Sequence, residues 1–211
     1  MTRRHILLFF LTFCLASGFR CNAAAQTNSA PIIACFGDSL TAGHGVEPGH
    51  AYPDYLQKLL NEHGYPYHVV NLGISGNTSK DGVERLKDVL ALHPRIVVLE
   101  FGGNDGLRGL PLNVTKQNLD QMIATLRKAG IKVVLAGITL PPNYGQDYIQ
   151  QFNDLYASLA KKYGIPLIPF LLKNVYDVPG SMQDDGIHPT AQGSKQVAAN
   201  VFGVMRPLLN K

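Results

Sequence analysis

Three side chains in this sequence have the types and spacing needed to turn a serine into a nucleophile. A serine hydroxyl is a weak nucleophile until a base removes its proton and a third group orients that base. Asp185 and His188 are three residues apart, and on a helical turn this spacing puts both side chains on one face. His188 would then donate one ring N–H to Asp185 and turn its other ring nitrogen towards Ser39. An isolated pair at this spacing is more often a surface turn, so its surroundings decide the interpretation.

Acyl transfer by such a serine also needs hydrogen-bond donors aimed at the oxyanion of the tetrahedral intermediate. Three candidates are the backbone N–H groups of Ser39 and Gly76 and the side-chain amide of Asn104. A glycine at position 76 would let the backbone approach a substrate closely, because it has no Cβ. Asp105 is interpreted as a structural residue of a tight turn, and Asp38 as a residue that caps or braces the turn before Ser39.

Other chemistries are less well supported by the sequence. Ser75 is a rival nucleophile, but Ser39 is favoured because it directly follows the first predicted strand. The sequence has no G-x-S-x-G nucleophile elbow, phosphate-binding loop, H-E-x-x-H or C-x-x-C motif. No metal or cofactor is predicted, because the remaining histidines lack the spacing of zinc ligands and are interpreted as surface or packing residues. These are His44, His50, His63, His68 and His93.

The pattern of apolar residues predicts the elements that would hold these side chains in place. Short, nearly continuous apolar runs predict five strands of a parallel sheet buried on both faces, at residues 31–36, 68–71, 95–101, 131–138 and 166–169. Apolar residues at helical spacing predict helices at residues 52–63, 81–90, 118–129, 147–163 and 190–209. Strands that alternate with helices predict an α/β fold with helices on both faces of the sheet.

The loops that follow the predicted strands gather the candidate residues at one edge of that sheet. Ligands of open parallel sheets bind beyond the carboxyl ends of the strands. The first three loops contain Ser39, Gly76 and Asn104, and the long segment after the fifth strand contains Asp185 and His188. Because all five residues fall on the same edge, we interpret them as one site.

Residues 1–25 have the pattern of a secretory signal peptide. Basic residues at positions 3–5 precede an apolar run at 6–15, and three alanines at 23–25 provide a small-residue cleavage site. The apolar run is too short to span a bilayer, so a retained membrane anchor is the weaker alternative. A lipoprotein is weaker still, because no small residue precedes Cys14 or Cys21. We therefore expect an exported protein, periplasmic or secreted, with one domain at residues 26–211.

Removal of this segment changes the inferences from composition. The formal charge of +4 falls to +1, because residues 1–25 contain three arginines and no acidic residue. A nearly neutral chain gives no reason to expect a nucleic-acid partner. Cys35 is then the only cysteine left, so no disulfide can form within the chain, and we expect this cysteine in the core.

Four blocks of this sequence resemble the SGNH/GDSL hydrolase superfamily. They are Gly-Asp-Ser-Leu at 37–40, Gly76, Gly-Gly-Asn-Asp at 102–105, and the pair Asp185 and His188. The resemblance implies a three-layer α/β/α flavodoxin-like fold. It also implies a triad of Ser39, His188 and Asp185, and an oxyanion hole formed by the Ser39 N–H, Gly76 and Asn104.

Three longer segments, at 102–109, 140–145 and 182–189, look like the periplasmic multifunctional acyl-CoA thioesterase/lysophospholipase/arylesterase group of that superfamily. In that group the loop after the asparagine helps to close over the acyl chain. The resemblance therefore implies acyl-contacting walls at 107–111 and 140–144. The residues named for this role are Leu107, Leu110, Pro111, Leu140, Pro141 and Tyr144.

The expected activity is hydrolysis of acyl esters and thioesters, including lysophospholipids and aryl esters, through an acyl-enzyme intermediate. The expected partner is a small-molecule acyl substrate, and the chain is expected to be a monomer without stable membrane insertion once the signal is removed. A carbohydrate O-deacetylase of the same superfamily is one alternative, and apolar residues such as Leu107 and Leu140 argue against it. A non-catalytic lipid-binding module is the other, and it would need neither His188 nor Asn104.

Overall fold

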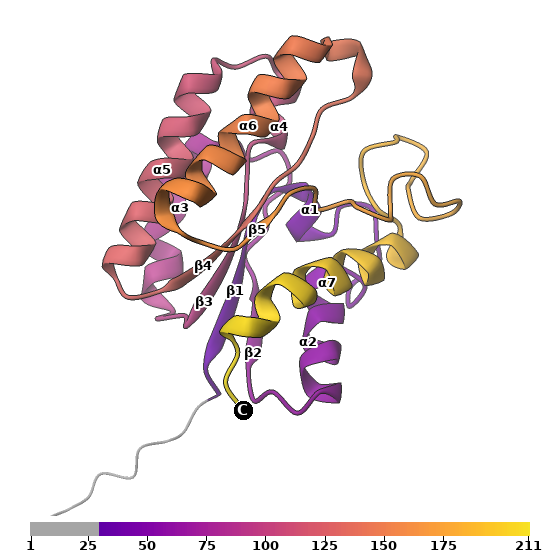
Figure 1. The fold of residues 1–211 in the computed structure, drawn as a ribbon. Helices are drawn as coiled ribbons and strands as arrows, with labels where there is room; N and C mark the ends of the chain where they lie inside the picture. The colour runs from indigo at the N-terminus through magenta and orange to yellow at the C-terminus, as the bar shows by residue number, and fades with distance from the viewer. Residues whose placement is uncertain (1–29) are drawn as a thin grey trace, which may run out of the picture.

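The computed structural model describes residues 30–211, which form a single parallel sheet covered by helices (Figure 1). The predicted signal peptide at residues 1–25 lies outside the described residues. The five strands lie in the order β2-β1-β3-β4-β5 and every pair is parallel. They are β1 (Ile32–Gly37), β2 (His68–Asn71), β3 (Ile96–Glu100), β4 (Lys132–Ala136) and β5 (Leu167–Ile168). All five predicted strands are present, and the predicted parallel sheet is confirmed.

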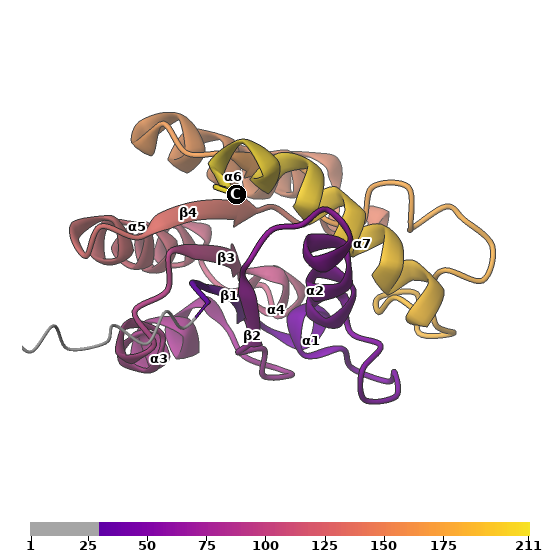
Figure 2. The same cartoon turned by 90° about the horizontal axis from the view of Figure 1, so that it is seen from below.

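Helices cover both faces of the sheet, as the alternating pattern predicts. On one face α2 (Tyr52–Glu62) packs against α7 (Ala191–Met205). On the other, α5 (Leu112–Lys128) packs against both α3 (Ser79–Ala91) and α6 (Gln146–Tyr163). Figure 2 shows the sheet edge-on between α3 and α5 on one side and α2 and α7 on the other. This is the three-layer α/β/α arrangement that the resemblance implied.

The position of each strand in the sheet, interior or edge, decides how fully its residues are buried. Every residue of β3 is buried, and so is β1 from Ile33 onwards. The edge strands differ from the prediction of burial on both faces: β2 is only partly buried, and β5 is two residues long. An edge strand has a hydrogen-bonded neighbour on one side only, so its apolar run is less completely covered.

Helix ends depart from the predictions where capping, rather than apolar periodicity, sets the boundary. Helix α3 begins at Ser79 because Thr78 caps it, accepting from the Asp81 N–H while the Asp81 carboxylate accepts from the Thr78 N–H. Helix α5 begins six residues before the predicted start. Helix α7 ends at Met205 and continues as the 3₁₀ turn η2 (Arg206–Leu208). Apolar spacing says little about first and last turns, which are commonly polar.

Two short helices at the carboxyl edge of the sheet were not predicted. They are α1 (Ser39–Ala42), directly after β1, and α4 (Gly103–Leu107), after β3. From β1 the chain adds β2 on one side of the sheet and then β3, β4 and β5 on the other, so the strand order reverses between β1 and β3, which is the point where such sheets bind ligands. Figure 1 shows both short helices at that edge, at the opposite end of the sheet from the C-terminus. Within residues 30–211, no helix is both long enough and apolar enough to cross a membrane.

Candidate active site

Ser39 is the first residue of α1 and lies just after the carboxyl end of β1, an interior strand of the sheet. Asp38 precedes it as the N-cap, and the Asp38 Oδ1 atom accepts from the Leu40 N–H at 3.1 Å. The prediction that Asp38 caps this turn is confirmed. The Ala42 N–H donates to the Asp38 carbonyl and the Gly43 N–H to the Ser39 carbonyl, so the backbone around the serine is held on both sides.

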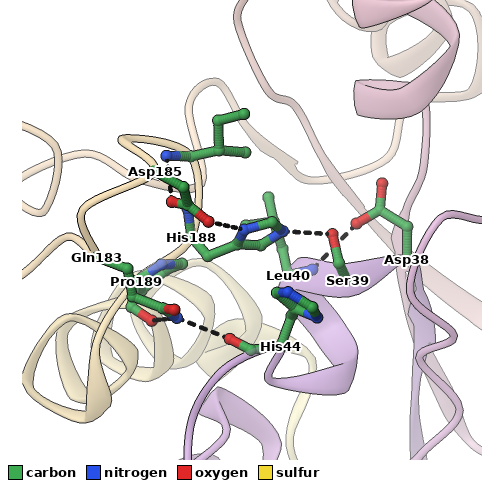
Figure 3. Close-up of polar contacts among 9 residues, drawn as sticks. Asp38, Ser39, Leu40, His44, Gln183, Asp185, His188 and Pro189 are labelled. Atoms are coloured by element: carbon green, nitrogen blue, oxygen red, sulfur yellow. Dashed lines mark hydrogen bonds and ion pairs between the residues drawn. The ribbon is translucent and has the colours of Figure 1, made fainter.

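The three residues predicted to form a nucleophilic site lie in one chain of hydrogen bonds (Figure 3). The Ser39 Oγ atom is 2.9 Å from His188 Nε2, and His188 Nδ1 is 2.7 Å from Asp185 Oδ2. Both distances are normal for hydrogen bonds between such groups. With its Nδ1–H donated to Asp185, the His188 ring leaves Nε2 free to accept the serine proton. Ser39, the favoured nucleophile, is the serine that forms this hydrogen bond with His188.

A turn, rather than a helix, brings Asp185 and His188 together, which corrects the prediction. The Asp185 Oδ1 atom accepts from the backbone N–H groups of Ile187 at 2.9 Å and His188 at 3.0 Å. The aspartate thus builds the turn that orients its own histidine partner. Helix α7 begins only at Ala191, where Thr190 is its N-cap. Partial burial opposes ionisation of Asp185, but the bonds from His188 and Ile187 hold its pKa at about 2, so the carboxylate is charged at neutral pH.

His44 was interpreted as a surface or packing residue, and the structure places it beside the site. Its ring lies against that of His188, with ring centroids 4.6 Å apart and tilted by 48°. It comes from the turn that follows α1, so its closeness in sequence to Ser39 was the available signal. Among residues 30–211, no group of three or more His, Cys, Asp or Glu side chains is arranged to hold a metal ion.

The candidate oxyanion donors lie on loops beside Ser39. Asn104 is in the first turn of α4, and its Nδ2 donates to Asp38 Oδ2 at 3.1 Å and to the Asn77 carbonyl at 3.0 Å. Gly76 has a φ of +83°, which an L side chain rarely adopts, so the need for glycine here is conformational. The Arg108 guanidinium donates to the Gly76 carbonyl at 2.9 Å. Two residues of the α4 segment therefore fix the loop that contains Gly76.

Asp105, interpreted as structural, is buried behind the site. Its carboxylate accepts from the Ser79 N–H at 2.8 Å and from the hydroxyls of Ser79 and Thr115. These contacts tie α4 to the starts of α3 and α5. The structural interpretation of Asp105 agrees with this geometry.

An apolar cavity of about 470 Å³ opens beside Ser39 and His188. Three of the predicted acyl-contacting residues, Leu107, Leu140 and Pro141, are in its walls. Three others are not: Leu110 and Pro111 are exposed outside it, and the Tyr144 hydroxyl donates to the Leu107 carbonyl at 2.8 Å. Tyr144 therefore supports the wall from behind.

A second group of residues that line this cavity was not predicted. It consists of Phe170, Leu172, Tyr176 and Ile187, from the segment between β5 and α7. Apolar residues directly after a predicted strand, on the ligand-binding edge, were the signal that could have identified them. Ile138 and Pro142 also contribute to the lining.

Glu100, at the end of β3, is a buried carboxyl group that was not predicted to have a role. Its Oε2 atom accepts from the Asp38 N–H at 3.1 Å and from the Thr41 hydroxyl at 2.9 Å. Within residues 30–211, its Oε1 atom is buried without a hydrogen-bond partner. Burial and the nearby Asp38 charge raise the pKa of Glu100 well above its ordinary value. Burial also raises the pKa of Asp38, but its bonds with Leu40, Glu100 and Asn104 oppose this rise.

The variant Glu100→Gln is therefore expected to fold at least as stably as the wild type at neutral pH. A raised carboxyl pKa contributes stability below the ordinary value of about 4.3 that is lost as pH rises through the folded-state pKa. Glutamine cannot ionise, so its advantage over the wild type should grow from pH 5 to pH 8. Urea unfolding at both pH values measures the difference.

Glu100→Ala is the contrasting variant. It leaves the Asp38 N–H unpaired and should lose about 1–3 kcal/mol of unfolding free energy. A wild type more stable than Glu100→Gln at pH 8 would mean that Glu100 is ionised.

Comparison with known proteins places this geometry in a recognised group. The profile of the GDSL-like lipase/acylhydrolase family matches residues 35–196. The chain is 44% identical over 188 residues to the esterase TesA of Pseudomonas aeruginosa, covering 89% of this chain and 91% of that one. It is 40% identical over 184 residues to thioesterase 1/protease 1/lysophospholipase L1 of Escherichia coli K12, covering 86% of each.

Solved structures agree with the sequence comparison. The crystal structure of TesA superposes with a TM-score of 0.81 at 44% identity, covering 84% of this chain and 99% of the solved one. The family profile, which matches residues 35–196, runs from β1 into α7 and so includes the loops at the carboxyl edge of the sheet.

Proposed function

The chain belongs to the GDSL-like lipase/acylhydrolase family, and from that premise we propose that it hydrolyses acyl esters and thioesters through an acyl-enzyme intermediate on Ser39. The enzyme is an SGNH-type hydrolase, and its relatives are named for esterase, thioesterase and lysophospholipase activities. The observation that carries the proposal is the hydrogen-bonded chain from Ser39 through His188 to Asp185, at the mouth of an apolar cavity.

The proposed reaction has two halves that use the same groups. His188 Nε2 takes the Ser39 proton as Oγ attacks the acyl carbonyl, and the negative charge on the carbonyl oxygen is held by the N–H groups of Ser39 and Gly76 and by Asn104. When the tetrahedral intermediate collapses, His188 gives its proton to the departing alcohol or thiol. Water then loses a proton to His188, attacks the acyl-serine and releases the acid, and the proton returns to Ser39.

The ionised Asp185 stabilises the imidazolium that forms twice in this cycle. In the free enzyme the Asn104 amide donates both of its hydrogens, to Asp38 and to the Asn77 carbonyl. These bonds hold the amide in place before substrate arrives. One of them must be shared or exchanged when the oxyanion forms. No step in this cycle uses a metal or a cofactor.

The cavity favours a substrate with an apolar acyl group. Its lining includes the aliphatic and aromatic side chains of Leu107, Leu140, Phe170 and Leu172 together with Ser39. A lysophospholipid, an aryl ester or an acyl thioester would each place the acyl chain there and the leaving group outside.

The proposal also includes export directed by residues 1–25 and a periplasmic or secreted location. Lysophospholipids and other envelope esters are more accessible there than acyl-CoA. The catalytic unit is a single domain at residues 26–211 that acts as a monomer.

Hydrolysis of p-nitrophenyl esters from acetyl to palmitoyl tests this proposal. Each methylene buried in the cavity contributes about 0.8 kcal/mol, so kcat/KM should rise by up to about fourfold per methylene until the cavity is full. Lysophosphatidylcholine and an acyl thioester should also be cleaved. A rate that is highest for acetyl esters and for acetylated oligosaccharides would instead support a carbohydrate O-deacetylase. Lipid binding without turnover would support a non-catalytic module.

Two exposed apolar residues provide a matched pair of variants for this test. Ile187 lines the cavity and Val114 does not, although both side chains are similarly exposed. Ile187→Ser should weaken the gain in kcat/KM with chain length, whereas Val114→Ser should leave it unchanged. Equal profiles for the two variants would contradict the placement of the acyl chain.

A further inference from the structure

Gln183 lies between the two parts of the site, although neither the proposed reaction nor the sequence pattern gives it a role. It is half-buried in the segment between β5 and α7, within residues 182–189, called here the His188 loop. Its side-chain Nε2 donates to the His44 carbonyl at 2.7 Å and to the Pro189 carbonyl at 2.9 Å (Figure 3). Both hydrogens of the amide are therefore used on backbone carbonyls.

The two carbonyls belong to the two segments that supply the nucleophile and its base. The His44 N–H donates to the Ser39 carbonyl at 3.1 Å, so the first contact is one hydrogen bond away from the serine backbone. Pro189 follows His188 directly, and the Gln183 N–H donates to the His188 carbonyl at 2.8 Å. Gln183 is 139 residues from His44, so this amide closes a long-range contact across the site.

The turn after α1 has room for this amide only because of a glycine. A Cβ atom at Gly45 would lie 2.2 Å from the Gln183 Oε1 atom, which is too close for any real contact. Gly45 also has a φ of +74°, which favours glycine. The turn is thus shaped around the Gln183 side chain.

We propose that Gln183 is a positioning residue that sets the separation between Ser39 Oγ and His188 Nε2 by linking the turn after α1 to the His188 loop. This inference rests on the proposed function, because it concerns the same serine and histidine. The Asp185–His188 hydrogen bond lies wholly within the His188 loop and is built by the Asp185 turn. Loss of the Gln183 amide should therefore loosen the Ser39–His188 contact while leaving the Asp185–His188 contact in place.

The residue type fits this role. A glutamine amide provides two N–H donors without charge, which matches two carbonyl oxygens that it must join. Methionine has a similar length and no donor, so Gln183→Met removes both bonds and keeps most of the packing. Gln183→Glu places a carboxylate oxygen where the amide nitrogen lies, next to two carbonyl oxygens that it would repel. This variant should lower activity at least as much as Gln183→Met.

Steady-state hydrolysis of a p-nitrophenyl ester is the first part of the test. In Gln183→Met, kcat should fall by about 10- to 100-fold, the loss expected when reacting groups are displaced by up to about 1 Å, while KM stays within about twofold. The matched control is Gln150→Met, which removes an amide that donates to Asp154 on the exposed surface of α6. That variant should retain wild-type kcat. An unchanged kcat in both Gln183 variants would overturn the proposal.

Two further measurements separate positioning from loss of folded structure. Reaction of Ser39 with a p-nitrophenyl phosphonate should slow by the same factor as kcat, because it needs the serine proton to pass to His188 but no acyl substrate. The low-field proton resonance of the His188–Asp185 hydrogen bond should persist in Gln183→Met. Its disappearance would show that Gln183 holds the His188 loop itself, and would overturn the proposal.

The outcomes also separate this inference from the proposed function. A wild-type protein that cleaves no ester would refute the proposed function, and phosphonate reactivity would still report on Gln183. A wild-type protein that cleaves esters as fast as its Gln183→Met variant would refute only the inference about Gln183.

Discussion

Replacement of Ser39 by alanine is expected to lower kcat/KM for a p-nitrophenyl ester by about 10⁴- to 10⁶-fold, the range seen when a serine hydrolase loses its nucleophile. The hydroxyl of this residue forms a hydrogen bond with His188 at 2.9 Å. Its removal leaves α1 and the oxyanion donors in place, because the cap of α1 is formed by Asp38. Substrate binding in the cavity should therefore survive while acyl transfer is lost. Steady-state kinetics with correction for spontaneous hydrolysis measures the change.

Ser75→Ala provides the matched control, because Ser75 also lines the cavity and was the rival nucleophile. Its loss should leave most of the activity. If Ser75→Ala were inactive and Ser39→Ala active, the nucleophile would be assigned to the wrong residue. If both retained wild-type rates, covalent catalysis by a serine of this cavity would be refuted.

Asn104→Ala should lower kcat by about 10²- to 10³-fold with little change in KM, because an oxyanion donor contributes to the transition state rather than to substrate binding. In the free enzyme the amide is held by Asp38 and the Asn77 carbonyl, so it is already oriented when the oxyanion forms. Stopped-flow or steady-state kinetics on one ester gives the split between kcat and KM.

Asn118→Ala is the corresponding control. Its side-chain amide donates to Ser79 from α5, and Asn118 is not among the residues that line the cavity. This variant should keep wild-type kcat even if it melts at a lower temperature. A loss of activity in Asn104→Ala that is matched by Asn118→Ala would indicate general disruption of the packing around α4 rather than loss of an oxyanion donor.

Much of the site could be predicted because it depends on strand ends. Ser39 and Asn104 follow β1 and β3, the two strands between which the strand order reverses. A buried parallel strand has a strong apolar signal, and the residue after it must lie at the carboxyl edge of the sheet. The sequence therefore located these residues without any knowledge of side-chain geometry.

The rest of the site depends on contacts that leave no periodic pattern in the sequence. The partnership of Asp185 and His188 was expected from helical spacing, but hydrogen bonds from the Ile187 and His188 backbone to the aspartate form a turn instead. Glu100 was taken as part of a buried strand, and only its contact with the Asp38 N–H shows that it supports the nucleophile turn. The long-range contact between Gln183 and His44 likewise has no local signal.

Only some of the residues that line the cavity were predicted, because the others likewise lack a local sequence pattern. The resemblance to a known group of hydrolases implied Leu107 and Leu140, but Phe170 and Tyr176 come from a long irregular segment whose side-chain directions no sequence pattern predicts. The position of such a segment depends on its contacts with the rest of the fold, so the sequence alone does not show which of its residues line the cavity.

Ser39 is the covalent nucleophile of the proposed reaction, and labelling with a p-nitrophenyl phosphonate is the direct test of this role. In this reaction Ser39 Oγ displaces p-nitrophenolate from phosphorus, and intact-mass spectrometry followed by peptide mapping locates the adduct. We predict one phosphonyl group per chain, on the peptide that contains Ser39, with loss of ester hydrolysis in proportion to labelling. An adduct on another residue, or full labelling of Ser39 with hydrolysis undiminished, would contradict the assignment of Ser39 as the nucleophile.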